Sequence, residues 1–185
     1  MSPVRLTRQE NQVSNMVMSA DDVRRAITRI AHEILERQHG PAQLAIVGLQ
    51  RGGAWLADAI TAAIRHIEPS TNVPLGYLDV SMHRDDIGLR PVVPGAISRI
   101  DFPVDGATVV LVDDVLYTGR TVRAAMEGIN TYGRPRAIQL AVLVDRGHRE
   151  LPIRPDYVGK NLPTNLVDDV RVASEGVVVT RDGTT

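Results

Sequence analysis

Two adjacent carboxylates and a short segment bearing hydroxyls and a glycine lie close together in the middle of the chain. Asp113 and Asp114 follow a β-branched apolar run, residues 109–112, which is typical of a strand buried on both faces of a parallel sheet. The segment 118–121, Thr-Gly-Arg-Thr, comes next and leads into an amphipathic helix. The pattern predicts a strand, two acids, a small turn and a helix, in that order.

This order of elements suits a phosphorylated sugar. The start of a helix offers free N–H groups and a positive dipole end to a phosphate, and Gly119 lets the backbone approach the ligand closely. Asp113 and Asp114 can accept hydrogen bonds from sugar hydroxyls or meet a metal ion. Paired acids also end strands in metal-binding signalling domains, but their combination with the Thr-Gly-Arg-Thr segment favours a ribose-phosphate site.

Length and composition indicate a single globular domain. The chain has 185 residues, of which 43% are hydrophobic. We expect a flexible extension at 1–18, one domain at 19–182 and a frayed tail at 183–185. There is no apolar run of membrane-spanning length, no apolar signal-peptide core and no cysteine, which together favour a reducing cytoplasm. The net charge of −1 does not by itself indicate nucleic acid.

The hydrophobic pattern predicts an α/β fold with a mostly parallel central sheet. A helix should begin at Ser19, whose spacing to Asp22 resembles a capping box, and end before Gly40 and Pro41. Most of the region 145–161 should be loop at the carboxyl edge of the sheet. The other expected elements are buried strands at 44–47, 75–80, 109–112 and 138–144, helices after Gly53 and Thr121, and a closing hairpin of 167–172 and 177–180.

A second glycine-rich turn, residues 48–53, also separates a strand from a helix, and it contains Gln50 and Arg51. Taken alone it is as consistent with a structural turn as with a phosphate site, but beside the first turn it becomes a pyrophosphate cradle. Residues 81–100 are rich in proline, glycine and charge. We interpret them as a lid in which Arg84 meets a leaving phosphate, with an unstructured surface loop as the alternative.

Basic residues gather in two places. One face of the first helix carries Arg25, Thr28, Arg29 and His32, and alone it would be interpreted as a solvated face. Between Arg134 and Lys160 the cations outnumber the anions. Two basic elements together favour an anionic partner.

Several motifs resemble the bifunctional pyrimidine-operon regulators that are also uracil phosphoribosyltransferases, the PyrR family. The resemblance covers about 19–180 and is strongest in residues 24–33 (Arg-Arg-Ala-Ile-Thr-Arg-Ile-Ala-His-Glu), 110–121, 138–154 and 156–161. The last two are not shared by phosphoribosyltransferases at large. Departures from the family pattern occur at Gln50, Gly53 and His83, and they bear on catalytic efficiency more than on nucleotide binding.

The resemblance implies a type I phosphoribosyltransferase-like fold with a mostly parallel sheet flanked by helices, a small hood and a mobile lid loop. It implies Mg²⁺ carried by the pyrophosphate, with no direct protein ligand. The implied partners are uracil, phosphoribosyl pyrophosphate, UMP or UTP, the leader of a pyrimidine-operon mRNA, and further copies of the chain in a homodimer or higher oligomer.

The resemblance also assigns roles to individual positions. The implied catalytic residues are Asp113, Asp114, Arg51 and Arg84. The implied substrate-binding residues are Gln50 and Arg51 for pyrophosphate; Asp113, Asp114, Val115, Leu116, Tyr117, Thr118, Gly119, Arg120 and Thr121 for ribose and its 5′-phosphate; and Val144, Asp145, Arg146 and Val170 around the base. The implied RNA-binding residues are Arg25, Thr28, Arg29, His32, Arg149, Arg154 and Lys160.

We therefore expect an RNA-binding regulator of pyrimidine-operon attenuation that responds to UMP and also makes UMP from uracil and phosphoribosyl pyrophosphate. The alternative is a nucleobase salvage enzyme, such as a purine phosphoribosyltransferase, without an RNA role. The motif at 144–152, Val-Asp-Arg-Gly-His-Arg-Glu-Leu-Pro, favours the first hypothesis.

Overall fold

Two β-sheets and the helices beside them form the part of the chain that the computed structural model describes, residues 12–50, 52–80 and 97–182. The central sheet is five-stranded and parallel, with the order β3-β2-β4-β5-β6. Its strands are β2 (Leu44–Gln50), β3 (Leu75–Asp79), β4 (Thr108–Leu116), β5 (Ala137–Asp145) and β6 (Tyr157–Asn161). The helices are α1 (Ala20–Gln38), α2 (Gly53–Ile67) and α3 (Arg120–Ile129).

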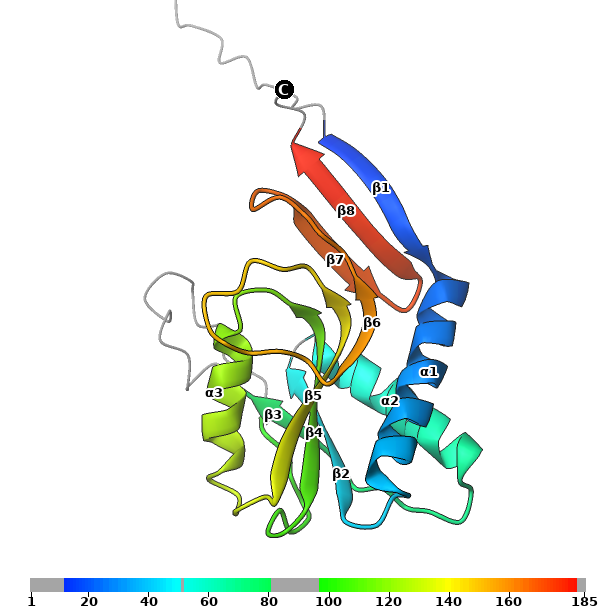
Figure 1. Ribbon diagram of the computed structural model, residues 1–185, viewed down its shortest axis with the longest axis vertical. Helices are drawn as coiled ribbons and strands as arrows, with labels where there is room; N and C mark the ends of the chain where they lie inside the picture. The colour runs from blue at the N-terminus through cyan, green and yellow to red at the C-terminus, as the bar shows by residue number, and fades with distance from the viewer. Residues whose placement is uncertain (1–11, 51, 81–96, 183–185) are drawn as a thin grey trace, which may run out of the picture.

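The alternation of side chains along the central strands builds a core on each face of the sheet. Val110 and Val112 of β4 belong to the core beneath α1 and α2. Val109 and Leu111 belong to the core beneath α3. Figure 1 shows α1 and α2 on one side of the sheet and α3 on the other. Because both faces are covered, the central strands are apolar on both sides, as the sequence predicts.

The strand order changes direction between β2 and β4. From β2 the chain crosses through α2 to β3 on one side, and from β4 it crosses through α3 to β5 and β6 on the other. In open α/β sheets, ligands bind outside the carboxyl ends of the strands at such a switch point. This rule points to the region where β2 and β4 end, which is where both glycine-bearing turns lie.

A small antiparallel sheet lies beyond the carboxyl ends of the central strands (Figure 1). It has the order β1-β8-β7 and consists of β1 (Gln12–Ser19), β7 (Asp169–Ala173) and β8 (Gly176–Asp182). The hairpin β7–β8 confirms the predicted closing hairpin, and the sheet corresponds to the expected hood. Residues 12–18 of the expected flexible extension belong to β1, which pairs with β8 over 150 residues away in sequence, and local patterns do not report such pairing.

The start of α1 agrees with the sequence prediction. Ser19 is the N-cap, and its side chain accepts a hydrogen bond from the Asp22 N–H while the Asp22 carboxylate accepts one from the Ser19 N–H. The Ser19 hydroxyl also donates to the Asp22 carboxylate at 2.7 Å, and this bond and the one from the Ser19 N–H lower the pKa of Asp22 to about 2, with a further contribution from Arg25. His39 ends the helix in the left-handed conformation, just before Gly40 and Pro41.

One predicted loop is a strand. Residues 157–161 form β6, which pairs in parallel with β5 at the edge of the sheet. Tyr157 is buried against the α1 side, whereas Lys160 and Asn161 are exposed. The segment is short and polar, so its sequence has no strong strand pattern. It is a strand because it pairs with β5. Among the described residues, no helix has the length and hydropathy needed to cross a membrane.

Candidate functional site: a ribose-phosphate crevice and a basic surface

Asp113 and Asp114 lie within the last residues of β4, which continues to Leu116 rather than ending at Val112 as predicted. The pairing of β2 with β4 stops at Gly48 and Val112, whereas β2 stays paired with β3 as far as Gln50, so both acids lie beyond the point where β2 and β4 part. Asp113 is buried, and its Oδ1 accepts the Asp114 N–H at 3.0 Å. The Oδ1 of Asp114 accepts the Val115 N–H at 2.8 Å.

The start of α2 packs directly against these acids. A Cβ atom at Gly52 would overlap the Asp114 carboxylate, and a Cβ atom at Gly53 would overlap the Val112 carbonyl oxygen. Only glycine therefore lets α2 approach β4 this closely. Gly53 departs from the family pattern, but here glycine is what the close approach of helix and strand requires. The packing sets the start of α2 against the two acids of β4.

Burial raises the pKa of Asp114, and the hydrogen bonds from Val115 and Asp113 oppose that rise. A carboxylate that is taken out of water without a cationic partner is costly to keep ionised. Ribose hydroxyls supply hydrogen-bond donors that a buried carboxylate can accept. The position of Asp114 thus suits a group that completes its hydrogen bonding with a ligand.

The turn before α3 leads into a helix N-terminus that can bind an anion. Gly119 is the N-cap with φ +92°, a left-handed conformation that favours glycine, and it has no side chain to cap the helix. The first turn of α3 contains no acidic residue. The Thr118 hydroxyl lies 3.4 Å from the Arg120 nitrogen. Backbone N–H groups, the helix dipole and the Thr118 hydroxyl are groups that can bind a phosphate, and phosphate binding by this segment stays a prediction.

Tyr117 joins this turn to the loop that follows β5. The Arg146 guanidinium lies 4.4 Å from the centroid of the Tyr117 ring, and the His148 ring meets Tyr117 edge-on at 5.9 Å. Arg146 is buried and donates to the carbonyl oxygens of Asn165 and Asp168, both at 2.9 Å. Arg146 therefore anchors the 164–168 loop. Sequence reasoning did not select His148, although it lies inside a motif that supports the family resemblance.

The remaining base-site residues also gather at this edge. Val144 is buried in β5, and its backbone pairs with Val115 of β4. The Asp145 carboxylate accepts bonds from the Gly147 N–H at 3.0 Å and from Arg149 at 2.5 Å. Val170, on β7, packs against the core. Gln50 ends β2, whereas Arg51, Arg84 and residues 81–96 of the lid predicted at 81–100 lie outside the described residues.

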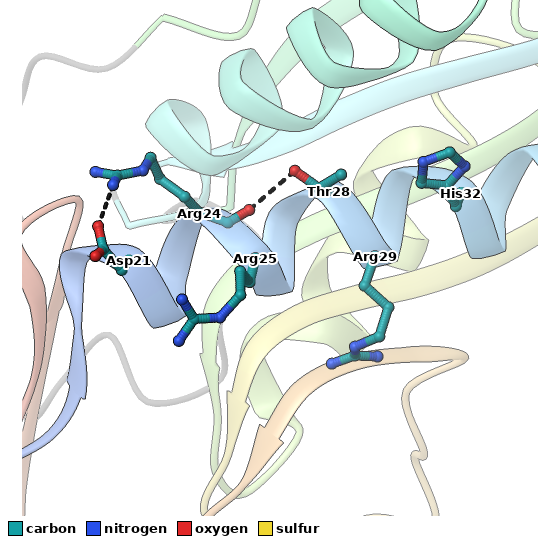
Figure 2. A pocket seen from close by; sticks show the side chains of 6 residues that line it. All are labelled: Asp21, Arg24, Arg25, Thr28, Arg29 and His32. Carbon is teal, nitrogen blue, oxygen red and sulfur yellow. Dashed lines mark hydrogen bonds and ion pairs between the residues drawn. The ribbon is translucent and has the colours of Figure 1, made fainter.

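The predicted RNA-binding stripe lies along the exposed side of α1, around a hollow of about 830 Å³. Figure 2 shows Arg25 and Arg29 pointing to one side of the helix, with Arg24, Thr28 and His32 along the other. Several of these cations have acidic neighbours on the helix. Arg25 pairs with Asp22 at 2.6 Å and Arg29 with Glu33 at 2.7 Å. Such exposed pairs contribute little to stability, so an anionic ligand can displace the acids at small cost.

The basic face of α1 continues onto β6. Arg29 donates to the carbonyl oxygens of Val158 at 2.9 Å and Gly159 at 2.8 Å, both on the open edge of that strand. A groove between α1 and β6 is lined by Arg25, Arg29 and Lys160. The structure thus brings Lys160 beside the helical stripe, from which it is separated by more than 100 residues of sequence.

Arg149 and Arg154 lie further along this surface and differ in their contacts. Arg149 is mostly buried, and its guanidinium bonds to Asp145 and to the carbonyl oxygens of Ile153, Tyr117, Leu116 and Gly147. Arg154 is exposed and makes no ion pair with another described residue. Both are predicted RNA contacts. The guanidinium of Arg149, however, already makes hydrogen bonds that connect the turn before α3 to the loop after β5.

Similarity to solved structures shows the fold. The chain matches a hypoxanthine phosphoribosyltransferase of Trypanosoma cruzi with a TM-score of 0.71 and 20% identity, over 96% of this chain and 95% of that one. It matches one from Staphylococcus aureus with a TM-score of 0.64 and 18% identity, over 90% of this chain and 85% of that one.

Sequence similarity to curated proteins shows the family. The chain is 57% identical to the "Bifunctional protein PyrR" of Roseiflexus sp. (strain RS-1), over 85% of each chain. It is 49% identical to that of Streptomyces coelicolor, over 88% of this chain and 84% of that one. The family model for the phosphoribosyl transferase domain matches residues 16–177. The chain therefore belongs to the phosphoribosyltransferase domain family and, within it, to the bifunctional PyrR proteins.

Proposed function

We propose that the chain transfers the phosphoribosyl group of phosphoribosyl pyrophosphate to uracil, giving UMP and pyrophosphate. We also propose that it binds the leader of a pyrimidine-operon mRNA in response to UMP and so controls attenuation. The observation that supports the enzymatic half best is the meeting of Asp113 and Asp114 with the uncapped start of α3 at the switch point of the sheet.

The reaction needs positioning and control of charge. Displacement of pyrophosphate at the anomeric carbon gives the sugar oxocarbenium character, so anionic groups near the ring stabilise the transition state. Asp113 and Asp114 hold the ribose hydroxyls in our proposal, and the start of α3 binds the 5′-phosphate. Arg51 and Arg84 remain the proposed cations for the leaving group. Backbone groups of residues 144–146 read the uracil edge. No side chain is assigned as a general base for the uracil nitrogen.

Magnesium suits this donor set. Mg²⁺ is a hard cation that is commonly bound through substrate phosphates and one or two carboxylates rather than by an all-protein cage. Carried by the pyrophosphate, it neutralises part of the leaving charge. Asp113 and Asp114, at the end of β4, are assigned to the ribose hydroxyls and not to the ion. We propose no direct protein ligand.

The enzymatic half is tested by supplying uracil, phosphoribosyl pyrophosphate and Mg²⁺ and measuring UMP. Asp114→Asn should lower kcat/KM by about 10- to 100-fold, as expected for loss of a charged hydrogen bond to the substrate. Asp101→Asn, which removes an exposed carboxylate paired with Arg99, is the matched control. Hypoxanthine or guanine accepted in place of uracil would favour the salvage alternative, and no product from any of the three bases would contradict the proposal.

The RNA-binding half is supported by the basic surface that runs from α1 to β6 and Arg154. Phosphate contacts need cations, and specific reading of RNA usually targets unpaired bases. Aromatic residues make up only 3% of the chain, so arginine, asparagine and histidine must do much of this work. A single copy presents one such surface, and we propose that a homodimer or higher oligomer joins two.

A gel shift with leader RNA, with and without UMP, tests this half. Arg25→Ala and Arg154→Ala should weaken binding about tenfold each without changing the rate of UMP formation. Arg29 and Arg149 are less suitable, because both donate to backbone carbonyls that hold the fold. Arg171→Ala, on the exposed part of β7, is the control. Equal binding by all four proteins would show that the surface is misassigned, and light scattering with and without RNA would report the oligomer.

A further inference from the structure

A second hollow, of about 730 Å³, lies at the far end of the basic surface. The loop from Gly147 to Pro155 forms most of its wall, and Val158 and Asn161 of β6 complete it. We call it the β5–β6 hollow. Its volume lies in the range of small-molecule sites, although it is open to solvent on one side. Asp145, which the resemblance places around the base, also lines the hollow, but its carboxylate is already bonded to the Gly147 N–H and to Arg149.

The wall combines apolar surface with two unengaged polar groups. Leu151, Pro152, Ile153 and Pro155 provide flat or aliphatic surface. Asn161 and Arg154 are exposed, and neither makes a side-chain hydrogen bond or ion pair with another described residue. An amide offers a donor and an acceptor side by side, which matches the edge of a nucleobase, and a guanidinium can stack on a base or bind a phosphate.

The hollow and the groove that leads from α1 share no lining residue, but they are lined by neighbouring residues of β6. Gly159 and Lys160 line that groove, and the residues on either side of them in β6, Val158 and Asn161, line the hollow. An RNA strand whose phosphates follow Arg25, Arg29 and Lys160 would reach the β5–β6 hollow at its end. Unpaired bases of such a strand are free to leave the stack.

We propose that the β5–β6 hollow takes one unpaired nucleobase of the bound RNA and that Asn161 reads the edge of that base. The inference rests on the RNA-binding half of the proposed function and names its specificity element. It assigns Asn161 a role separate from the phosphate contacts, because an amide carries no charge to contribute to them.

Arg149 gives this hollow a physical connection to the nucleotide site. Its guanidinium bonds to the carbonyl oxygens of Tyr117 at 2.8 Å, in the turn that meets the phosphate, and of Ile153 at 3.0 Å, in the wall of the hollow. A ligand that orders the turn before α3 thereby also orders one wall of the hollow. Such coupling is reciprocal, so RNA should tighten UMP binding by the same factor by which UMP tightens RNA binding.

The test uses RNA hairpins selected from a library with a randomised loop for binding to the full chain in the presence of UMP. Each loop nucleotide of the selected RNA is then replaced in turn by an abasic one. With the wild-type chain, one position should lose about 10- to 100-fold in affinity, the range for a single base contact. With Asn161→Ala, the RNA that is abasic at this position and the unmodified RNA should bind with the same reduced affinity. An abasic nucleotide at any other position should lower the affinity of Asn161→Ala by the same factor as for the wild-type chain.

Two controls separate the possible failures. Asn15→Ala, at an exposed asparagine of β1, should leave the abasic profile unchanged. The KM for uracil should also be unchanged in Asn161→Ala, and a raised KM would mean that the hollow belongs to the active site. If the wild-type chain selects no RNA, the RNA-binding half of the proposed function fails. If it selects RNA but Asn161→Ala keeps the full abasic profile, only the hollow is misassigned.

Discussion

The buried carboxylate of Asp114 has a cost to stability and a proposed role in ligand binding, and the two can be separated by experiment. Burial raises its pKa, so the folded chain holds the proton more readily than the unfolded chain does. The ionised carboxylate therefore destabilises the fold above that raised pKa, and the cost disappears as the pH falls through it. The Asp114 carboxylate accepts the Val115 N–H, and in our proposal a bound ribose supplies further hydrogen-bond donors.

Asp114→Asn should accordingly stabilise the free protein at pH 8 while lowering UMP formation. We expect Tm to rise by about 2–4 °C, the shift that roughly 1 kcal/mol produces in a chain of this size. The gain should vanish at acidic pH, where the wild-type side chain is also neutral. Thermal unfolding of both proteins between pH 4 and pH 8 measures this. A lower Tm at pH 8, or a gain that is independent of pH, would contradict the argument.

At the residue scale the sequence predicts the acids and the Thr-Gly-Arg-Thr turn well, because their spacing is local. It does not predict the contacts of Arg149. An arginine in a basic loop looks like a contact for nucleic acid, but five carbonyl or carboxylate partners surround its guanidinium in the fold. Those partners come from β4, β5 and the following loop, which are assembled only in the tertiary structure.

At the element scale, α1 carries both a core face and the basic face, so its stability bears on the RNA-binding surface. Ser19→Ala removes the N-cap oxygen that accepts the Asp22 N–H. Loss of such a cap should lower Tm by about 2–4 °C. Ser19→Asp, which keeps a capping oxygen, should restore much of it. Thermal unfolding followed by circular dichroism gives the values.

The control for this comparison is Ser174→Ala, at an exposed serine in the turn between β7 and β8. It should leave Tm unchanged. If Ser19→Ala and Ser174→Ala behave alike, the capping box contributes nothing measurable, and α1 is held by the packing of Ile30 and Ile34 alone.

The start of α2 gives a second prediction for an element. Gly53→Ala would place a methyl group against the Val112 carbonyl and push α2 away from the acids of β4. Overpacking of this kind costs about 1–3 kcal/mol, and here it should also raise the KM for phosphoribosyl pyrophosphate. Urea unfolding and steady-state kinetics measure the two effects. Unchanged values of both would show that the helix start moves freely to accept the methyl group.

At the scale of the whole molecule, charge distribution decides how RNA is bound. The net charge is only −1, so attraction of RNA must come from the local basic surface and not from the chain as a whole. If about four to six phosphates are neutralised, affinity should fall about 10²-fold between 50 and 200 mM salt. Binding titrations at several salt concentrations give the slope. Arg25→Ala should reduce its magnitude by about one phosphate contact, whereas Asn161→Ala should leave the slope unchanged.

The sequence by itself determined the fold class, the family, the buried strands and the ribose-phosphate motif, because hydrophobic periodicity and short motifs are local properties of the chain. Only the tertiary structure decided which distant segments meet. It pairs β1 with β8, adds β6 to the edge of the sheet, sets Gly52 against Asp114 and brings Lys160 beside the stripe on α1. These outcomes depend on contacts between residues far apart in sequence, which no local pattern encodes.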